Sequence, residues 1–245
     1  MQLTKVELQV SDSGHAAHIV VPGGLLTTVV ARELATACES LRENRSVRVV
    51  TVTAASTDFC SGADDELDRF GLRPDPAAAL AALRPPVIMA IDGRCNAEGL
   101  EIALAADIRV GSPGSSYALD HIAEGRVPAW GGTQRLPRAI RPGAAIGAAL
   151  LGESFDAETA RSLGLLYAVS DDLQAEVDRL VELLISRGPL ALELTKEAVH
   201  RGSEMPLRDG LRLEGDLNHQ LAATEDRAEG LQAFFDKRPP DFSGR

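Results

Sequence analysis

The sequence is poor in cysteine, lysine and aromatic residues, and it contains no long hydrophobic run. Its three cysteines, Cys38, Cys60 and Cys95, are too few for a disulfide framework and lack the spacing of a metal site. No stretch of about 18 uncharged apolar residues occurs, which argues against a transmembrane helix. The first ten residues also lack the basic start and apolar block of a signal peptide. A metal-free protein of the reducing cytoplasm is therefore expected.

Positive charge is also scarce. The chain has 25 basic against 36 acidic residues, a net charge of −11, and no basic cluster of more than a few residues. A protein whose main partner is nucleic acid or an anionic membrane carries a basic surface, so both partners are excluded.

The 245 residues, 44% of them hydrophobic, suffice for one large domain or for one domain with a small appendage. Short apolar runs predict strands at 6–10, 18–21, 47–53 and 87–91, and apolar residues at helical spacing predict a helix over 30–45. The run at 47–53 is nearly continuous and β-branched, as in a strand covered on both faces. This alternation of strands and helices predicts an α/β domain.

The second half of the chain is mainly helical in pattern. A small, apolar helix is expected over 96–106, and a Gly-rich segment, 125–132, leads into another. Residues 154–156 (SFD) look like a helix start. From Leu173 onward the pattern is helical, with no strand after about Val169.

Three segments contain residues suited to chemistry. The Gly-containing turn at 58–64 follows a strand and exposes backbone amides, although most such turns have no function. Glu98 and Glu101 lie one turn apart on the buried helix, where they are either catalytic or helix-capping carboxylates. His121 and the single tryptophan, Trp130, are each more often structural than reactive. Taken singly, each of these signals is weak.

Taken together, in this order and spacing, the segments resemble the crotonase (enoyl-CoA hydratase/isomerase) superfamily. The resemblance covers almost the whole chain, and its most specific parts are the central segment and GGTQRLPR. The matching segments are FCSGAD (59–64), PPVIMAIDGRCNAEGLEIALAADIRV (85–110), GRVPAWGGTQRLPRAIRPGAA (125–145), FDAETARSLGLLYAV (155–169) and FFDKRPPDFSGR (234–245).

The resemblance implies a spiral of ββα units over residues 1–186 and a C-terminal helical trimerisation region over 187–245. It also implies a homotrimer or hexamer that binds an acyl-CoA, with no cofactor beyond the CoA of the substrate. The oxyanion hole would consist of the backbone amides of Ala63 and Glu98, with Glu101 as principal acid/base and His121 as the second. The substrate-binding residues that it implies are Cys60, Gly62, Asp64, Gly99, Asp120, Trp130, Gly131 and Lys237.

Two of the implied catalytic positions depart from the hydratase pattern. Glu98 stands where hydratases have glycine, and a carboxylate beside an oxyanion is repulsive unless it points away or is protonated. The replacement of glycine by glutamate would also strain the backbone if position 98 needs a positive φ. His121 replaces the second catalytic glutamate, although histidine can act as acid or base near neutral pH, and Asp120 could substitute if the loop shifts by one residue.

Two further departures concern the ligand. The loop at 22–28, which in the family bears basic residues that bind the CoA nucleotide, has no charge here. Only 20 residues separate Asp64 from Pro85, which predicts a shortened flap over the acyl pocket. Lys237 matches a basic residue that reaches CoA in the family, sometimes from a neighbouring subunit. These features leave open a carrier-bound acyl thioester as the substrate.

These residues are compatible with several functions. Reversible hydration of a 2-enoyl-CoA is the first hypothesis, because Glu101 is present. Isomerisation, decarboxylation and thioester hydrolysis use similar oxyanion stabilisation. A non-catalytic partner in a biosynthetic assembly is the alternative from a different class. A Rossmann-type nucleotide enzyme is disfavoured because no GxGxxG follows a strand.

Overall fold

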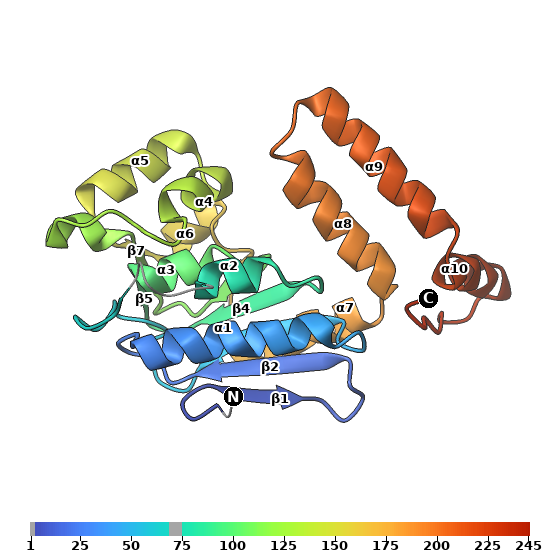
Figure 1. The fold of residues 1–245 in the computed structure, drawn as a ribbon, viewed down its shortest axis with the longest axis horizontal. Coiled ribbons are helices and arrows are strands. Elements are labelled where there is room, and N and C mark those ends of the chain that lie inside the picture. The colour runs from blue at the N-terminus through green and yellow to red at the C-terminus, as the bar shows by residue number, and fades with distance from the viewer. Residues whose placement is uncertain (1–2, 69–74) are drawn as a thin grey trace.

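The computed structural model describes residues 3–68 and 75–245, which form a core of sheet and helices with a helical arm (Figure 1). The main sheet has six strands in the order β1-β2-β3-β4-β6-β9, with β1 antiparallel to β2 and the other neighbours parallel. These strands are β1 (Glu7–Val10), β2 (Ala16–Val21), β3 (Val49–Ala54), β4 (Val87–Ile91), β6 (Ile108–Gly111) and β9 (Ala168–Val169).

A second, three-stranded sheet branches from the ends of these strands. It consists of β5 (Arg94–Asn96), β7 (Ser116–Ala118) and β8 (Phe155–Asp156), with β7 in the middle. Strands β4 and β5 precede one helix and β6 and β7 precede the next, so the chain advances in repeated ββα turns. This arrangement confirms the α/β class expected from the sequence.

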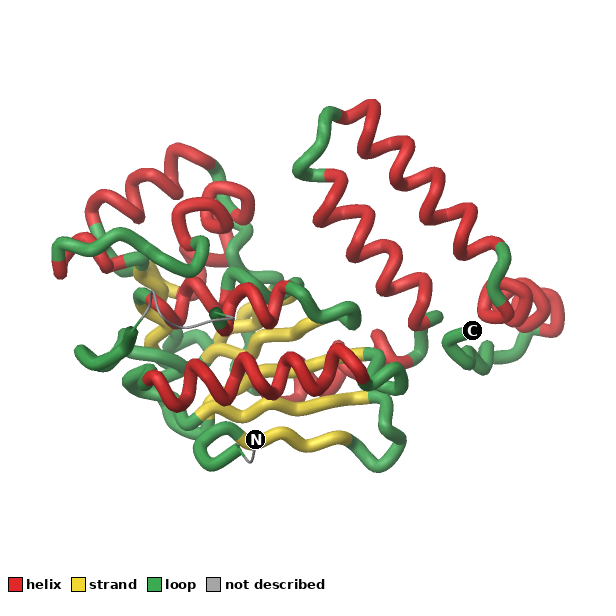
Figure 2. The backbone as a smooth tube through the Cα atoms, in the orientation of Figure 1, coloured by secondary structure: helices red, strands yellow, loops and turns green. Residues whose placement is uncertain are grey.

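Helices cover both faces of the main sheet (Figure 2). One face packs against α1 (Thr28–Glu43), α2 (Pro76–Ala81) and α3 (Glu98–Ala103). The opposite face packs against α7 (Leu173–Ile185) through Val177, Leu180 and Val181. Strand β3 contributes Val49 to the α7 side and Val50 to the α1 side, which confirms that it is covered on both faces.

The remaining core helices lie over the second sheet and the end of α3. They are the 3-10 helix η1 (Asp120–Glu124), α4 (Gly132–Ala139), α5 (Pro142–Leu151) and α6 (Ala157–Leu163). The helix start expected at 154–156 is confirmed, because Asp156 caps α6 by accepting from the amide of Thr159 at 2.8 Å. The sequence did not predict that Phe155 and Asp156 also form β8 in the second sheet.

The C-terminal arm consists of α8 (Pro189–Gly202), α9 (Leu207–Ala222) and α10 (Glu225–Asp236). Figure 1 shows α8 and α9 side by side, extending away from the sheet. Ion pairs fix α8 to the core: Lys196 lies 2.7 Å from Asp107, and Arg84 lies 2.9 Å from Glu193. No strand follows β9 in the described part of the chain, as the sequence predicts. The division into 1–186 and 187–245 stays a prediction.

The shortest helices and strands were not predicted correctly from the sequence. Strand β5 occupies 94–96, where the helix over 96–106 was expected to begin, and α3 itself is only 98–103. Helix α2 lies in the Ala-rich tract after Asp75, which caps the helix by accepting from the amide of Ala78. Residues 69–74, within the stretch where a shortened flap is expected, lie outside the described residues. Across 3–68 and 75–245, no helix is long and apolar enough to cross a membrane.

Glu33 is a buried carboxylate that fastens the start of the chain to α1. Its oxygens accept from the hydroxyl of Thr4 at 2.7 Å and from the backbone amides of Thr4, Lys5 and Val6 at 2.7 to 2.9 Å. Burial alone would raise the pKa of Glu33, but these hydrogen bonds outweigh it and hold the pKa at about 2.

This depressed pKa predicts an acid-dependent contribution to stability. Because the carboxylate is favoured in the folded state, its contribution is complete above the unfolded pKa of about 4.5 and is lost as pH falls toward 2. We expect Glu33→Gln to destabilise the protein at pH 7, and the difference from the unaltered chain in unfolding free energy to shrink between pH 5 and pH 3. Urea unfolding measures both values. Glu39→Gln, an exposed change on the same helix, is the matched control, and a Glu33→Gln effect that does not depend on pH would contradict the assignment.

Candidate active site

Three segments far apart in sequence meet at α3: the turn after β3, the start of α3 itself, and the stretch from η1 to α4. At their meeting point the side chains of Glu101 and His121 are both fully buried. The Nε2 atom of His121 lies 3.1 Å from Oε2 of Glu101 and 3.8 Å from Oε1 of Glu98. Asp120, the possible substitute, instead accepts a long hydrogen bond of 3.4 Å from the Asn96 side chain. The structure thus brings His121, and not its neighbour, against Glu101.

Backbone amides from the Gly-rich segment hold the Glu101 carboxylate. Its Oε1 accepts from the amides of Trp130 at 2.7 Å and Gly132 at 2.8 Å, and its Oε2 lies 3.3 Å from the amide of Ala129. Gly131 makes this turn with a φ of 98°, a conformation that favours glycine. The carboxylate therefore has a fixed orientation toward His121. Trp130 contributes through its main chain, while its indole is buried.

The Glu98 side chain has a cationic neighbour that the sequence reading missed. Its Oε1 lies 2.7 Å from Nη1 of Arg126, whose Nη2 lies 2.6 Å from the exposed Glu124. A carboxylate buried to 1% exposure requires compensation by a positive charge or by hydrogen bonds. This requirement could have predicted a cationic partner from the sequence. A carboxylate at a buried helix start needs a cation, and Arg126 lies in the family-matching segment 125–145.

The two backbone amides implied as oxyanion donors are positioned by neighbouring hydrogen bonds. Leu26 donates its amide to the carbonyl of Gly62 and accepts from the amide of Asp64, both at 2.9 Å. Because successive amides of an extended chain point to opposite sides, the Ala63 amide faces away from this pairing. The Glu98 amide belongs to the first residue of α3, where no helical acceptor exists. Both amides thus lie at turns of the chain, one after β3 and one at the start of α3.

Glu98 itself does not occupy the strained backbone position that a glycine replacement would suggest. The positive φ falls one residue earlier, at Ala97, with φ 46° and ψ −117°. Gly99, the residue after Glu98, packs closely on Cys60: a Cβ atom at position 99 would lie 2.4 Å from the Cβ of that cysteine. The chain thus makes a tight, strained entry into α3 directly beside the Glu98 amide.

This strain at Ala97 predicts a stabilising substitution. A non-glycine residue in such a region costs of the order of 1–3 kcal/mol, more than the roughly 0.5–1 kcal/mol of backbone entropy that glycine adds. We expect Ala97→Gly to raise the melting temperature by about 2–4 °C, corresponding to about 1 kcal/mol. Thermal unfolding measures this shift. Ala82→Gly, at an exposed position with φ −82°, is the matched control and should give no increase; an equal or lower melting temperature for Ala97→Gly would contradict the strain.

The remaining residues implied for substrate binding lie in different environments. Cys60 is buried beside the turn, and burial raises the pKa of its thiol to about 11, which makes it a poor nucleophile at neutral pH. Gly62 has a φ of 118° in the same turn, and Asp64 accepts from the amide of Glu66 at 2.8 Å. Lys237 ends α10, which Figure 1 places at the opposite end of the molecule from α3. Within one chain, Lys237 is therefore apart from the other candidates.

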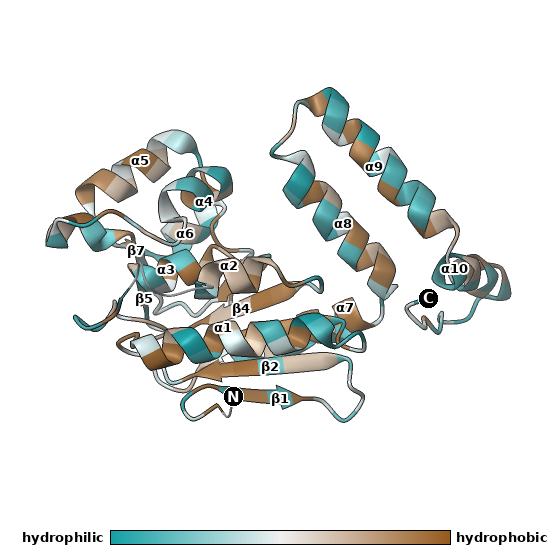
Figure 3. Ribbon diagram, viewed as in Figure 1, coloured by the Kyte–Doolittle hydropathy of each residue, from teal (hydrophilic) through white to brown (hydrophobic). Residues whose placement is uncertain are grey.

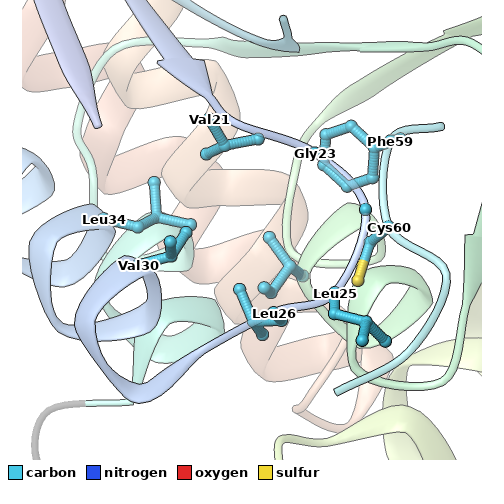
Figure 4. Close-up of a pocket in the computed structure, with 10 residues that line it drawn as sticks. Val21, Gly23, Leu25, Leu26, Val30, Leu34, Phe59 and Cys60 are labelled. Carbon is cyan, nitrogen blue, oxygen red and sulfur yellow. The ribbon is translucent and has the colours of Figure 1, made fainter. Parts of the chain in front are cut away.

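The uncharged loop at 22–28 borders a small apolar cavity between β2, α1 and the turn after β3 (Figure 4). Val21, Leu26, Val30, Phe59 and Cys60 line it. Its volume of about 20 Å³ is close to the minimum for one water molecule.

Comparisons with known proteins agree with this fold and site. Residues 25–245 match the family model for enoyl-CoA hydratase/isomerase. The 2,3-dehydroadipyl-CoA hydratase of Escherichia coli strain K12 is 36% identical over 230 residues, with 90% of each chain covered. The mitochondrial methylglutaconyl-CoA hydratase of Mus musculus is 32% identical, with 89% of this chain and 75% of that protein covered. The crystal structure of an enoyl-CoA hydratase from Bacillus anthracis superposes with a TM-score of 0.91 at 30% identity, covering 99% of this chain and 100% of the other.

The fold is therefore the crotonase fold, and the site brings the titratable side chains of Glu101 and His121 together at α3. The chain belongs to the enoyl-CoA hydratase/isomerase family, within the crotonase superfamily, and is an enzyme of that type acting on acyl-CoA.

Proposed function

We propose that the protein catalyses the reversible hydration of a 2-enoyl-CoA, with no cofactor beyond the CoA of the substrate. The observation that carries this proposal is the buried contact of 3.1 Å between Glu101 and His121. Two groups that can each hold or exchange a proton lie together beside the start of α3, where the Glu98 amide lies. Hydration needs such a pair because water must be both held and deprotonated.

In the proposed reaction, the oxygen of water bonds to C3 of the enoyl group while one of its protons passes to the acid/base pair. The electron pair of the C2–C3 double bond moves to the thioester oxygen, and the amides of Ala63 and Glu98 donate hydrogen bonds to the resulting enolate. A proton from the pair then adds to C2. Glu101 acts as the principal acid/base, and His121, in contact with it, as the second.

Other crotonase reactions differ from hydration in their products. Isomerisation moves the double bond, decarboxylation releases carbon dioxide, and thioester hydrolysis releases free CoA. Incubation with crotonyl-CoA and a panel of longer enoyl-CoA thioesters, followed by mass spectrometry, separates them. We expect the mass of the substrate plus one water, with the CoA retained; a panel that yields only isomers, free CoA or no product would contradict the proposal.

For the CoA moiety we propose binding chiefly through the pantetheine and thioester. The loop at 22–28 is uncharged, so it offers no cation to the nucleotide phosphates. Lys237 lies far from α3 in its own chain, so it would have to reach CoA from a neighbouring copy. A carrier-bound acyl thioester fits the same features and is the second candidate for the ligand.

We further propose that the C-terminal arm over 187–245 assembles the protein into trimers or hexamers. Figure 3 shows hydrophobic residues along both α8 and α9. On these helices Val199, Leu207 and Leu211 are exposed. At the end of α10, Phe234 is 77% exposed and Phe235 is 73% exposed. Exposed apolar residues in this number mark an interaction surface, and a second copy of the chain is the expected occupant.

The oligomeric state can be measured directly. Light scattering at micromolar concentration should give a mass of three or six times 25.9 kDa. Replacing Leu207 and Leu211 together with serine should lower that mass, because both side chains lie exposed on α9. A monodisperse monomer of the unaltered chain would contradict this proposal.

We also place the protein in the cytoplasm. This location is supported by its three cysteines, all buried and free.

A further inference from the structure

We propose that Arg126 is a positioning residue that holds the Glu98 carboxylate away from the oxyanion hole. This inference rests on the proposed function, which assigns the Glu98 amide to the enolate oxygen. It explains how the chain carries a carboxylate on the same residue whose backbone must stabilise negative charge.

The geometry of the pair is specific. Nη1 of Arg126 lies 2.7 Å from Oε1 of Glu98, a carboxylate of 1% exposure. The other edge of the guanidinium binds Glu124, with Nε at 2.7 Å and Nη2 at 2.6 Å from the same oxygen. Arg126 is thereby held in place from the surface side while its inner nitrogen reaches Glu98. A planar, permanently charged guanidinium is suited to bridging two carboxylates in this way.

The need for such a residue follows from electrostatics. Only a few bonds separate the Glu98 carboxylate from the Glu98 backbone amide, so the carboxylate lies close to any oxyanion that this amide binds. In a buried site the repulsion between these two negative charges is weakly screened. Pairing with Arg126 makes the two side chains together neutral and draws the carboxylate toward residue 126. It also leaves His121, 3.8 Å from Glu98, in closer contact with Glu101 at 3.1 Å.

Arg126 could alternatively bind an acidic group on the substrate directly. Both edges of its guanidinium, however, already contact carboxylates, one from Glu98 and one from Glu124. The structure therefore favours the positioning role, and a direct role becomes one outcome of the test.

The test is a double-mutant series of Arg126→Gln, Glu98→Gly and the two combined. The hydration rate of a 2-enoyl-CoA is measured, with kcat and KM determined separately. We expect Arg126→Gln to lower kcat at least about tenfold with KM changed less than about threefold, because the interaction matters most when the enolate forms. Glu98→Gly removes the carboxylate and keeps the amide, so it is the reference background in which the effect of Arg126→Gln is measured without a carboxylate to hold.

The combined variant gives the decisive result. With no carboxylate left to hold, Arg126→Gln should have little further effect, so the double variant should match Glu98→Gly within about threefold. A double variant as impaired as Arg126→Gln alone would overturn the proposal in favour of direct substrate contact. An Arg126→Gln variant with unchanged kcat would also overturn it. Should Arg126→Gln fail to fold, comparison of the double variant with Glu98→Gly still decides between these roles.

The matched control is Arg138→Gln, which breaks an exposed ion pair of 2.9 Å with Glu204 outside the site and should leave kcat unchanged. Binding of acetoacetyl-CoA, detected by the absorbance of its enolate, provides a readout independent of hydration. Enolate binding should weaken in Arg126→Gln and recover in the double variant, and an unchanged affinity across the series would overturn the role of Arg126. Failure of the unaltered chain to hydrate any enoyl-CoA would instead overturn the proposed function.

Discussion

Replacement of Glu101 with glutamine is expected to reduce kcat by at least about a hundredfold, because a positioned acid/base group contributes about 10²–10⁴-fold to the rate. Glutamine has the same shape and retains an oxygen that can accept from the amides of Trp130 and Gly132, now 2.7 and 2.8 Å from Oε1. The fold should therefore persist while the ionisable group is lost. Stopped-flow or steady-state hydration of crotonyl-CoA measures the effect.

The control for this change is Glu153→Gln, an exposed carboxylate in the turn after α5, which should leave kcat unaltered. Circular dichroism and the melting temperature establish that Glu101→Gln is folded. A folded Glu101→Gln variant that keeps more than about a tenth of the activity would show that Glu101 is not the principal acid/base group. The backbone amides of Ala63 and Glu98, proposed as oxyanion donors, would then account for most of the catalysis.

Removal of the imidazole of His121 should have a comparable effect. We expect His121→Ala to lower kcat by about a hundredfold, because Glu101 loses the partner that lies 3.1 Å from its Oε2.

Chemical rescue separates a catalytic from a structural role of this histidine. The alanine variant leaves a buried space of imidazole shape, so added imidazole should restore part of the activity of His121→Ala and none of that of Glu101→Gln. If His121→Ala retains nearly full activity, His121 is structural and the proposed pair is wrong.

The sequence predicted the large elements because each has its own periodicity. The apolar spacing of α1 and the β-branched run of β3 are visible in single segments. Strands β5 and β7, of three residues each, are too short to show a period, and they exist because they pair with one another in the folded chain. The helix start expected at 154–156 is confirmed at Asp156, but strand β8 at 155–156 was missed for the same reason, since it forms by pairing with β7.

The candidate site was predicted only in part. The resemblance to crotonases named Glu101 and His121, and the structure brings them into contact. It could not name Arg126, because an ion pair between residues 28 positions apart depends on how η1 lies against α3. The resemblance also suggested a positive φ at Glu98, because hydratases have glycine there. The positive φ occurs at Ala97 instead, a detail of backbone geometry that residue types do not reveal.

The proposal that Glu101 and His121 together catalyse hydration is tested most directly by tracing labelled water into the product. The unaltered chain is incubated with a 2-enoyl-CoA in water enriched in the heavy oxygen isotope ¹⁸O, and the products are separated and fragmented by mass spectrometry. The account predicts one heavy oxygen, bonded to C3 of a 3-hydroxyacyl-CoA, at a rate that falls at least about a hundredfold in Glu101→Gln. Heavy oxygen only in a released carboxylic acid, or an unlabelled isomer as the sole product, would contradict it.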